Sequence, residues 1–346
     1  MKKKLSLKAF VIIFASLLVV LAVATAILWP IFWKNADPDS IPLTVVLGSD
    51  SDKYNGYADV TLYGAVANDG KDDTDAFIKA AKTGAGVYVP LGTFDIKKTV
   101  TLRGQNLKGA GMDRSVIRFN GNGTIVEVKG ATLVDDITLT FAEKNITGKE
   151  KAGEQVAIKD LGLSNGAMLR AVKLYNVGTG FLSEQNYETN LSFMVESLII
   201  DKFSHKAIEM KNASTTVFRT TEIGEAYTSV EEAVALGGSF TLDTVVFSGT
   251  KCNYPIVFNN CETAVINTVV FNGAEAKSGS LIKSISSVIS MRTVTVKATK
   301  ATNLVKIEDN AKYGETMGNI ISLWSNSGKL SIDDKNLIKC ESNISQ

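Results

Sequence analysis

The sequence predicts an all-β protein built as a single-stranded parallel β-helix, and three observations support this prediction. Five segments between Phe193 and Lys297 align, and their starts differ by 23, 24, 24 and 24 residues. A second set of short apolar runs falls between them, from KAIEM at Lys206 to LVKI at Leu304. Both sets are rich in Val, Ile, Phe and Thr, as strands are, and neither is long enough for a helix with a core face. The aligned segments are FMVESLIIDK from Phe193, TVFRTTEIGE from Thr216, FTLDTVVFSG from Phe240, AVINTVVFNG from Ala264 and VISMRTVTVK from Val288.

A fixed period in the twenties indicates a solenoid, in which each repeat buries its apolar side only against its neighbours. With two or three strands in each repeat and no helix, the repeats are expected to form coils about 4.8 Å apart, each adding a strand to several parallel sheets. The Leu and Asn spacing of a leucine-rich repeat is absent. The positions expected to form apolar columns inside the coils are Val195, Ile199, Leu242, Val246, Ile266 and Val270.

Composition excludes several classes of function. The formal charge of the 346 residues is +1, and without the four lysines that precede the first apolar segment 33 basic and 36 acidic residues remain. That balance gives no basic surface for nucleic acid, so no nucleic-acid partner is expected. Three cysteines and one histidine favour neither a disulfide scaffold nor a zinc site, and we expect no metal and no cofactor.

The N-terminal segment predicts attachment to a membrane. Residues 9–33 carry no charge and follow four lysines in residues 1–8. A helix of that length crosses the hydrocarbon layer of roughly 30 Å, and the lysines place the basic segment in the cytoplasm. A cleaved signal peptide, cut near Ala24-Thr25-Ala26, is the alternative and would give a secreted protein. Both interpretations place the rest of the chain outside the cytoplasm: a polar linker over residues 34–58 and one β-helix domain over residues 59–340.

The segment from Val60 to Leu102 predicts a strand, a turn at Asn68-Asp69-Gly70, a short helix and further strands. Asp72, Asp73 and Thr74 offer side-chain oxygens that can cap the start of this helix, whose apolar residues are Ala76, Phe77, Ala80 and Ala81. Neighbouring acids such as Asp72 and Asp73 are found in catalytic pairs, but capping is the interpretation that we favour here.

This segment resembles the opening of the pectate-lyase-like superfamily, which includes polygalacturonases, rhamnogalacturonases and phage tailspike domains. The features that match are YGA at Tyr63, DG-x-DDT from Asp69, the A-F-x-x-A helix, VYVPLGTF from Val87 and LKGAG from Leu107. The resemblance implies a right-handed parallel β-helix (pectin lyase fold) with a short N-terminal capping helix, a carbohydrate partner, and active clefts along one sheet. It also makes a trimer an open alternative.

Two departures from the repeat are expected. Residues 141–165 are rich in Lys, Glu and Gly and predict a loop or small excursion beside the β-helix, and the tail from Glu308 to Gln346 loses the period. A column of charged residues on successive repeats, Glu196, Arg219 and Asp243, predicts a structural charge ladder, in which each exposed pair contributes about 0.5 kcal/mol.

The candidate catalytic residues come from the second set of strands. Where polygalacturonases carry Asn-Thr-Asp, Asp-Asp and His-Gly, this sequence has Ser204-His205-Lys206, Glu231-Glu232 and Asn253-Tyr254. Glycoside hydrolysis needs one acid to protonate the leaving oxygen and a second carboxylate, several ångströms away. Glu209, Glu231 and Glu232 are the candidate acids, and His205 or Lys206 could assist. The competing interpretation, that these are solvated turn residues, is favoured because a Glu-Glu pair is common.

Candidate substrate-binding residues are Tyr254 and Tyr227, whose rings could stack on sugars, and the basic Lys283. A lyase would need a calcium-binding cluster of carboxylates, and this set of strands carries too few acids for one. Two functions therefore remain open. The chain is a glycoside hydrolase or polysaccharide lyase acting on an acidic polysaccharide, or it is a non-catalytic carbohydrate-binding or structural surface protein that kept the scaffold.

Overall fold

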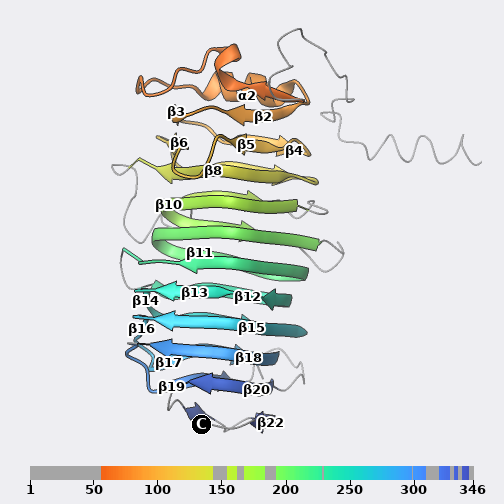
Figure 1. The fold of residues 1–346 in the computed structure, drawn as a ribbon, viewed down its shortest axis with the longest axis vertical. Coiled ribbons are helices and arrows are strands. Elements are labelled where there is room, and N and C mark those ends of the chain that lie inside the picture. The colour runs from red at the N-terminus through yellow and green to blue at the C-terminus, as the bar shows by residue number, and fades with distance from the viewer. Residues whose placement is uncertain are drawn as a thin grey trace, which may run out of the picture. The chain divides into compact units, whose positions relative to one another are not determined.

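The computed structural model describes residues 56–142, 154–161, 167–183, 192–227, 230–297, 299–308, 319–327, 331–333 and 337–342. Every strand pairing within these ranges is parallel. Successive coils follow one another from α2 at one end to β22 at the other (Figure 1). The predicted parallel β-helix is confirmed.

Each coil contributes strands to three columns. The first column contains β2 (Gly86–Val89), β5 (Leu107–Gly109), the first parts of β8 (Leu133–Phe141), β10 (Ala167–Ser183) and β11 (Ser192–Ile223), a later part of β11, the end of β12 (Val230–Leu242), and the first parts of β15 (Thr263–Asn272) and β18 (Val288–Lys297). β1 (Tyr57–Asp59) precedes β2 in this column, and β20 (Asn319–Ser327) and β22 (Leu337–Ser342) follow β18.

The second column contains β3 (Gly92–Ile96), β6 (Ser115–Phe119), the middle parts of β8, β10 and β11, β13 (Val245–Ser248), and the later parts of β15 and β18. The third column contains β4 (Val100–Arg103), β7 (Thr124–Lys129), β9 (Val156–Asp160), the last part of β10, the part of β11 around Ile208, the part of β12 around Val234, β14 (Lys251–Asn259), β17 (Ser280–Ile285), β19 (Asn303–Glu308) and β21 (Ser331–Asp333). β16 (Glu275–Ala276) pairs beside β14.

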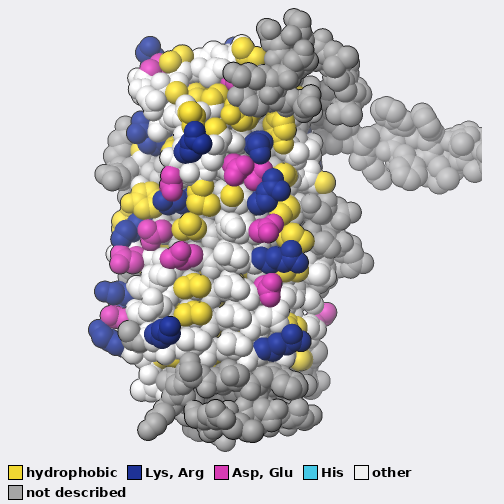
Figure 2. Space-filling model, in the orientation of Figure 1, with side chains coloured by type: hydrophobic (Ala, Val, Ile, Leu, Met, Phe, Trp, Pro, Cys, Tyr) yellow, Lys and Arg dark blue, Asp and Glu magenta, His cyan; other side chains and the backbone are white. Residues whose placement is uncertain are grey.

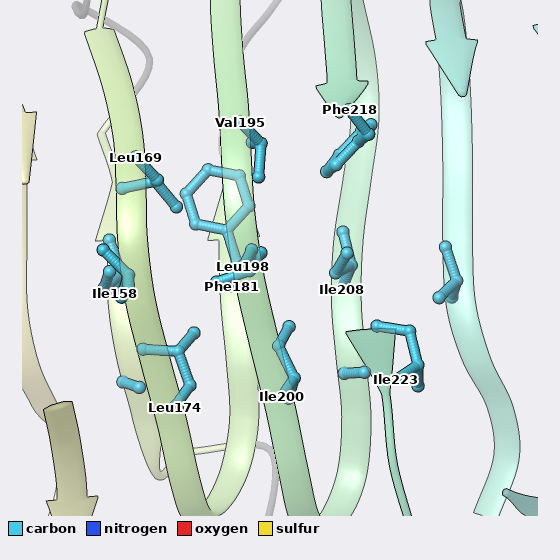
Figure 3. Close-up of a cluster of buried hydrophobic side chains, with 14 of the residues drawn as sticks. Ile158, Leu169, Leu174, Phe181, Val195, Leu198, Ile200, Ile208, Phe218 and Ile223 are labelled. Atoms are coloured by element: carbon cyan, nitrogen blue, oxygen red, sulfur yellow. The ribbon is translucent and has the colours of Figure 1, made fainter. Parts of the chain in front are cut away.

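The interior is filled by apolar side chains that stack from coil to coil. Leu169, Val195 and Phe218 come from different coils and lie in one buried cluster (Figure 3). Phenylalanines continue the pattern: the rings of Phe247 and Phe271 stack with centroids 5.1 Å apart. Since each coil has neighbours on both sides, the core is continuous through the described coils, as the repeat predicted.

Half of the predicted core positions are buried, and the chain corner at Ser197 explains one of the exceptions. Val195, Leu242 and Ile266 are buried, but Ile199, Val246 and Val270 are half-buried and their neighbours face inward. The prediction assumes unbroken strand alternation from Val195 to Ile199, but Ser197 between them has a φ of 57° and turns the chain. The left-handed residue resets the alternation, so that Leu198 and Ile200 point inward instead.

The N-terminal helices confirm the expected cap. The 3₁₀ helix η2 (Val60–Tyr63) precedes α2 (Thr74–Lys82), which buries Ala76, Phe77, Ala80 and Ala81. Asp73 occupies the N-cap position, but its Oδ1 accepts a hydrogen bond from the backbone N–H of Val66 at 2.9 Å rather than from the helix. Asp72 Oδ1 accepts from the backbone N–H of Thr74. The two acids are structural, as predicted, and Asp73 ties the preceding turn to the helix.

The segment predicted to be a loop beside the β-helix contains a strand. β9 pairs with β7 below it and with β10 above it, so residues 154–161 complete a coil of the third column. The prediction for this part was wrong because VAIKD is short and is flanked by Lys- and Gly-rich sequence that hides the apolar pattern. The remainder of the predicted insertion, residues 143–153 and 162–166, lies outside the described residues.

The predicted membrane segment, residues 9–33, also lies outside the described residues. Among the residues that are described, no helix is both long enough and apolar enough to cross a membrane.

Candidate functional site

Most of the predicted site residues lie on the outer surface of the third column. We call this surface the charged strip and define it by Lys206, Glu209, Glu232, Lys283, Lys306 and Glu308, together with Tyr254. The residues come from β11, β12, β14, β17 and β19. The parallel register brings residues more than 100 positions apart onto one face.

The register also divides the charged strip into two ends. Glu209 is in register with Ala235, Ala235 with Val257, and Val257 with Lys283. Three strand spacings therefore separate Glu209 from Lys283, a distance of about 14 Å. The predicted acids and the predicted basic residue Lys283 do not converge on one point, and Ala235 and Val257 lie between them.

At the first end, Lys206 joins two of the predicted acids. Its Nζ lies 3.3 Å from Glu209 Oε1 and 3.3 Å from Glu232 Oε2. The three side chains are only 14 to 25% exposed, whereas Lys211, which contacts Glu209 at 3.3 Å, is 74% exposed. Glu209 and Glu232 are thus brought together, as the catalytic hypothesis requires, but a half-buried ammonium group occupies the space between them.

Electrostatics fix the protonation of this cluster. Burial would raise the pKa of Glu209, but the charges of Lys206 and Lys211, together with their hydrogen bonds, outweigh burial and hold its pKa below the usual value. Burial and the charge of Lys206 lower the pKa of His205, against the opposing pull of Glu209 and Glu232. At neutral pH the cluster therefore holds Glu209 as a carboxylate and His205 as a neutral imidazole.

Glu231 and Tyr227 lie apart from this cluster. Glu231 is exposed, and its carboxylate accepts a hydrogen bond from the Asn253 side chain rather than from Lys206. Tyr227 is 46% exposed, and its hydroxyl donates to the side chain of Asn176. The structure thus separates these two predicted site residues from the Lys206 cluster.

At the second end of the charged strip, two lysines cover Tyr254. Lys283 Nζ lies 5.2 Å and Lys306 Nζ 6.0 Å from the ring centroid, and both pair with Glu308, at 2.8 and 2.7 Å. The Tyr254 residue is only 8% exposed, so a sugar would meet the lysines and not the ring. The predicted stacking role of Tyr254 is therefore corrected: its buried ring supports Lys283 and Lys306.

Sequence reasoning missed Glu308, because this residue marks the position at which the repeat was expected to end. The signal was available in LVKIE, where Lys306 and Glu308 alternate with the core residues Val305 and Ile307. No group of three or more His, Cys, Asp or Glu side chains within the described ranges could hold a metal ion.

Comparison with known proteins places this geometry in context. The family described as rhamnogalacturonase A/epimerase, pectate lyase-like, matches residues 57–150. The catalytic domain of Agl-KA has a similar fold, with a TM-score of 0.52 and 15% identity over 83% of this chain and 69% of that domain. Residues 57–150 thus resemble this family, and the described coils form a parallel β-helix. The resemblance predicted from the sequence is confirmed.

Two phage proteins resemble this chain over different lengths. The tailspike protein of Acinetobacter baumannii phage AM24 has a TM-score of 0.52 and 12% identity, over 83% of this chain and 54% of the tailspike. The pre-neck appendage protein of Bacillus phage B103 is 38% identical over 61 residues, which are 17% of this chain and 7% of that protein. The chain thus spans about half of the tailspike and matches a small part of the appendage protein.

Proposed function

We propose that this β-helix binds polysaccharide through the charged strip without cleaving it. The observation that carries the proposal is the position of Lys206, 3.3 Å from both Glu209 and Glu232. The family match to rhamnogalacturonases supports a carbohydrate partner, and the contacts of Lys206 support binding rather than hydrolysis.

Hydrolysis of a glycosidic bond needs a carboxylic acid that keeps its proton near neutral pH, and enzymes obtain one by raising its pKa. The environment of Glu209 does the opposite, because Lys206 and Lys211 favour the ionised form. Glu209 therefore lacks the raised pKa of a general acid at the position where the two predicted acids meet. The Lys206 ammonium is itself in contact with two carboxylates, so it is not free to approach a sugar proton as the base of a lyase reaction.

The charged strip offers binding groups instead. Lys283 and Lys306 present two ammonium groups next to the Glu308 carboxylate, and the more exposed of the two, Lys306, is 36% exposed. Lysine and glutamate side chains can donate to and accept from sugar hydroxyls, and lysines attract uronate carboxylates. The backbone of these residues is held in a parallel sheet, so the protein loses little backbone conformational entropy when a ligand binds.

The proposal also includes the location of the protein. The apolar residues 9–33 after four lysines support a single membrane-spanning helix that holds the β-helix on the outer surface, with secretion as the alternative. Protease treatment of intact cells that express the full chain tests this: cleavage of the β-helix from outside agrees with it, and protection contradicts it.

The function is tested with the purified full-length chain on a panel of pectic and bacterial polysaccharides. Binding is measured by calorimetry, and turnover by reducing ends and by the ultraviolet absorbance of unsaturated products. Binding without turnover is expected, and a Lys283→Ala/Lys306→Ala variant should weaken it. Lys300→Ala is the matched control, since Lys300 is 78% exposed and pairs with Glu275 away from the charged strip. Turnover that disappears in Glu209→Gln or Glu232→Gln would establish an enzyme and refute the non-catalytic proposal.

A further inference from the structure

A surface groove of about 800 Å³ lies outside the charged strip. It crosses the second column in the N-terminal coils, and β3, β6, β8 and β10 each contribute to its wall, together with the turn that precedes α2. The four strands belong to consecutive coils, so the groove extends about 14 Å along the axis of the β-helix. Its length favours an extended ligand over a single small molecule.

Arg118 in the wall of this groove is held in a fixed position. Its Nε and Nη2 donate to the two carboxylate oxygens of Asp95, at 2.6 and 2.7 Å, and Asn120 Nδ2 donates to Asp95 Oδ1 at 2.5 Å. The Asp95 side chain is 4% exposed and that of Arg118 is 43% exposed. The buried carboxylate therefore orients the guanidinium of Arg118, which lines the groove.

The guanidinium keeps binding capacity in this arrangement. It has five N–H donors, and the bonds to Asp95 use two of them. Within the described part of the chain, the other three have no hydrogen-bond partner. A preorganised arginine with free donors matches the planar, two-oxygen geometry of a carboxylate, sulfate or phosphate group.

The surrounding charges also favour an anion. The charged residues that line the groove are Lys71, Lys97, Arg118, Asp72 and Asp95. Asp95 is neutralised by Arg118, and Asp72 lies 3.9 Å from Lys97 Nζ, a distance at which the lysine remains available. Lys97 is 61% exposed at the rim. Tyr175, from the fourth coil, adds a half-buried aromatic ring at the far end, with Lys173 Nζ 5.9 Å from the ring centroid. The part of the ring that is exposed can contact a sugar.

We propose that this groove is a second binding site, which holds an acidic group of an extended glycan on Arg118 while Lys97 and Tyr175 contact the neighbouring units. The glycan part of the proposal rests on the proposed function, but the site is separate from the charged strip. The acidic group is a carboxylate or a sulfate or phosphate ester, which share the same oxygen geometry.

The experiment measures binding of three oligosaccharides to the full-length chain by calorimetry: oligogalacturonate, dextran sulfate oligomers and neutral dextran. Arg118→Gln should weaken binding of the acidic oligomers at least about tenfold. Lys97→Ala and Tyr175→Ala, which leave the Asp95 pair intact, should each weaken it by about threefold. The better of the two acidic oligomers identifies the group. Arg292→Gln is the control, because Arg292 is an exposed arginine on the first column and should change nothing.

A second variant covers the case in which Arg118→Gln fails to fold. Asp95→Asn/Arg118→Gln removes both charges together, and unfolding in urea shows whether the β-helix is retained. Unchanged affinity in a folded variant that lacks Arg118, or equal affinity for neutral dextran, would overturn the groove proposal. If Lys283→Ala/Lys306→Ala abolishes binding and Arg118→Gln leaves it intact, the groove proposal is also overturned. The same result would support the function proposed for the charged strip.

Discussion

Arg170 holds Asp135 with two hydrogen bonds, from Nε to Oδ1 at 2.9 Å and from Nη2 to Oδ2 at 2.6 Å, across 35 residues of sequence. Lys108 Nζ, one coil earlier, contacts the same carboxylate at 3.1 Å. The Asp135 side chain is 2% exposed, so these two cations supply its charge compensation. Figure 2 shows dark-blue and magenta side chains alternating from coil to coil on this face. The ion pairs on this face thus join Lys108, Asp135 and Arg170, whereas no ion pair within the described residues joins Glu196, Arg219 and Asp243, the predicted members of the charge ladder.

The first prediction concerns pH and the Asp135 carboxylate. Burial would raise the pKa of Asp135, but the bonds from Arg170 and Lys108 outweigh burial and lower it. A lowered pKa in the folded state gives stability that is fully present above the unfolded pKa of about 3.9 and is lost as the pH falls through the lower folded value. Asp135→Asn should therefore reduce the free energy of unfolding by about 2 kcal/mol at pH 7.

Urea unfolding of wild type and variant between pH 3 and pH 7 measures this difference, which should shrink below about pH 4. The control is Asp113→Asn. Asp113 contacts Lys173 at 2.7 Å but is 62% exposed, so its loss should cost less than about 1 kcal/mol. A difference for Asp135→Asn that does not depend on pH would contradict the assignment.

The second prediction concerns the close approach of two coils at Gly238. This residue has a φ of 106°, and a Cβ atom there would lie 2.0 Å from the backbone oxygen of Ala213 on the preceding coil. Gly123 has a similar φ of 108° but open space around it. Gly123→Ala should cost about 1 to 2 kcal/mol for backbone strain alone.

Gly238→Ala should cost more than Gly123→Ala, because the backbone of a neighbouring coil has to move as well. Thermal and urea unfolding of the two variants isolate the contribution of the contact. Equal losses in both variants would show that the coils can separate there without penalty.

The third prediction uses His205, the single histidine of the chain, whose ring signals in NMR spectra need no assignment experiments. Burial and Lys206 lower its pKa, so it should titrate below the ordinary value of about 6.5. Lys206→Met removes the repelling charge and should raise the pKa of His205. The same variant should raise the pKa of Glu209.

Lys211→Met is the matched control for this titration. Lys211 also contacts Glu209 but is largely exposed, and water screens its charge. It should leave the pKa of His205 nearly unchanged. A pKa that does not move in Lys206→Met would place the lysine elsewhere in solution and would remove the main support for the non-catalytic proposal.

The fourth prediction concerns the thiols of Cys252 and Cys261. Both are buried and free, and burial raises the pKa of each to about 12. The thiolate is the reactive form, so both thiols should resist a thiol reagent at pH 8 in the folded protein. In a Cys340→Ser background the reagent should react only as fast as urea unfolds the β-helix. Rapid labelling without urea would show that the coils around β14 open locally.

The sequence was sufficient to predict the architecture. The repeats are 23 to 24 residues long, and their apolar runs are too short to form helices. Such repeats can bury their apolar side chains only by stacking on one another. The capping helix was also predictable, since Ala76, Phe77, Ala80 and Ala81 follow helical spacing and all are buried. The expected alternation of inward and outward side chains fails where the coil turns at Ser197, because this residue has a positive φ and changes which later side chains face inward. A serine in the sequence does not indicate this conformation.

The candidate site depended on information that the sequence does not contain. The sequence identified Glu209, Glu232 and Lys206 as ionisable residues on neighbouring repeats, but their roles depend on where one ammonium group lies. The tertiary structure put Lys206 between both carboxylates, left Glu231 outside, and buried Tyr254 under two lysines. It also formed the groove around Arg118 from four coils. Repeat spacing fixes which coil a residue belongs to, whereas the register between coils and the burial of each charge decide what that residue can do.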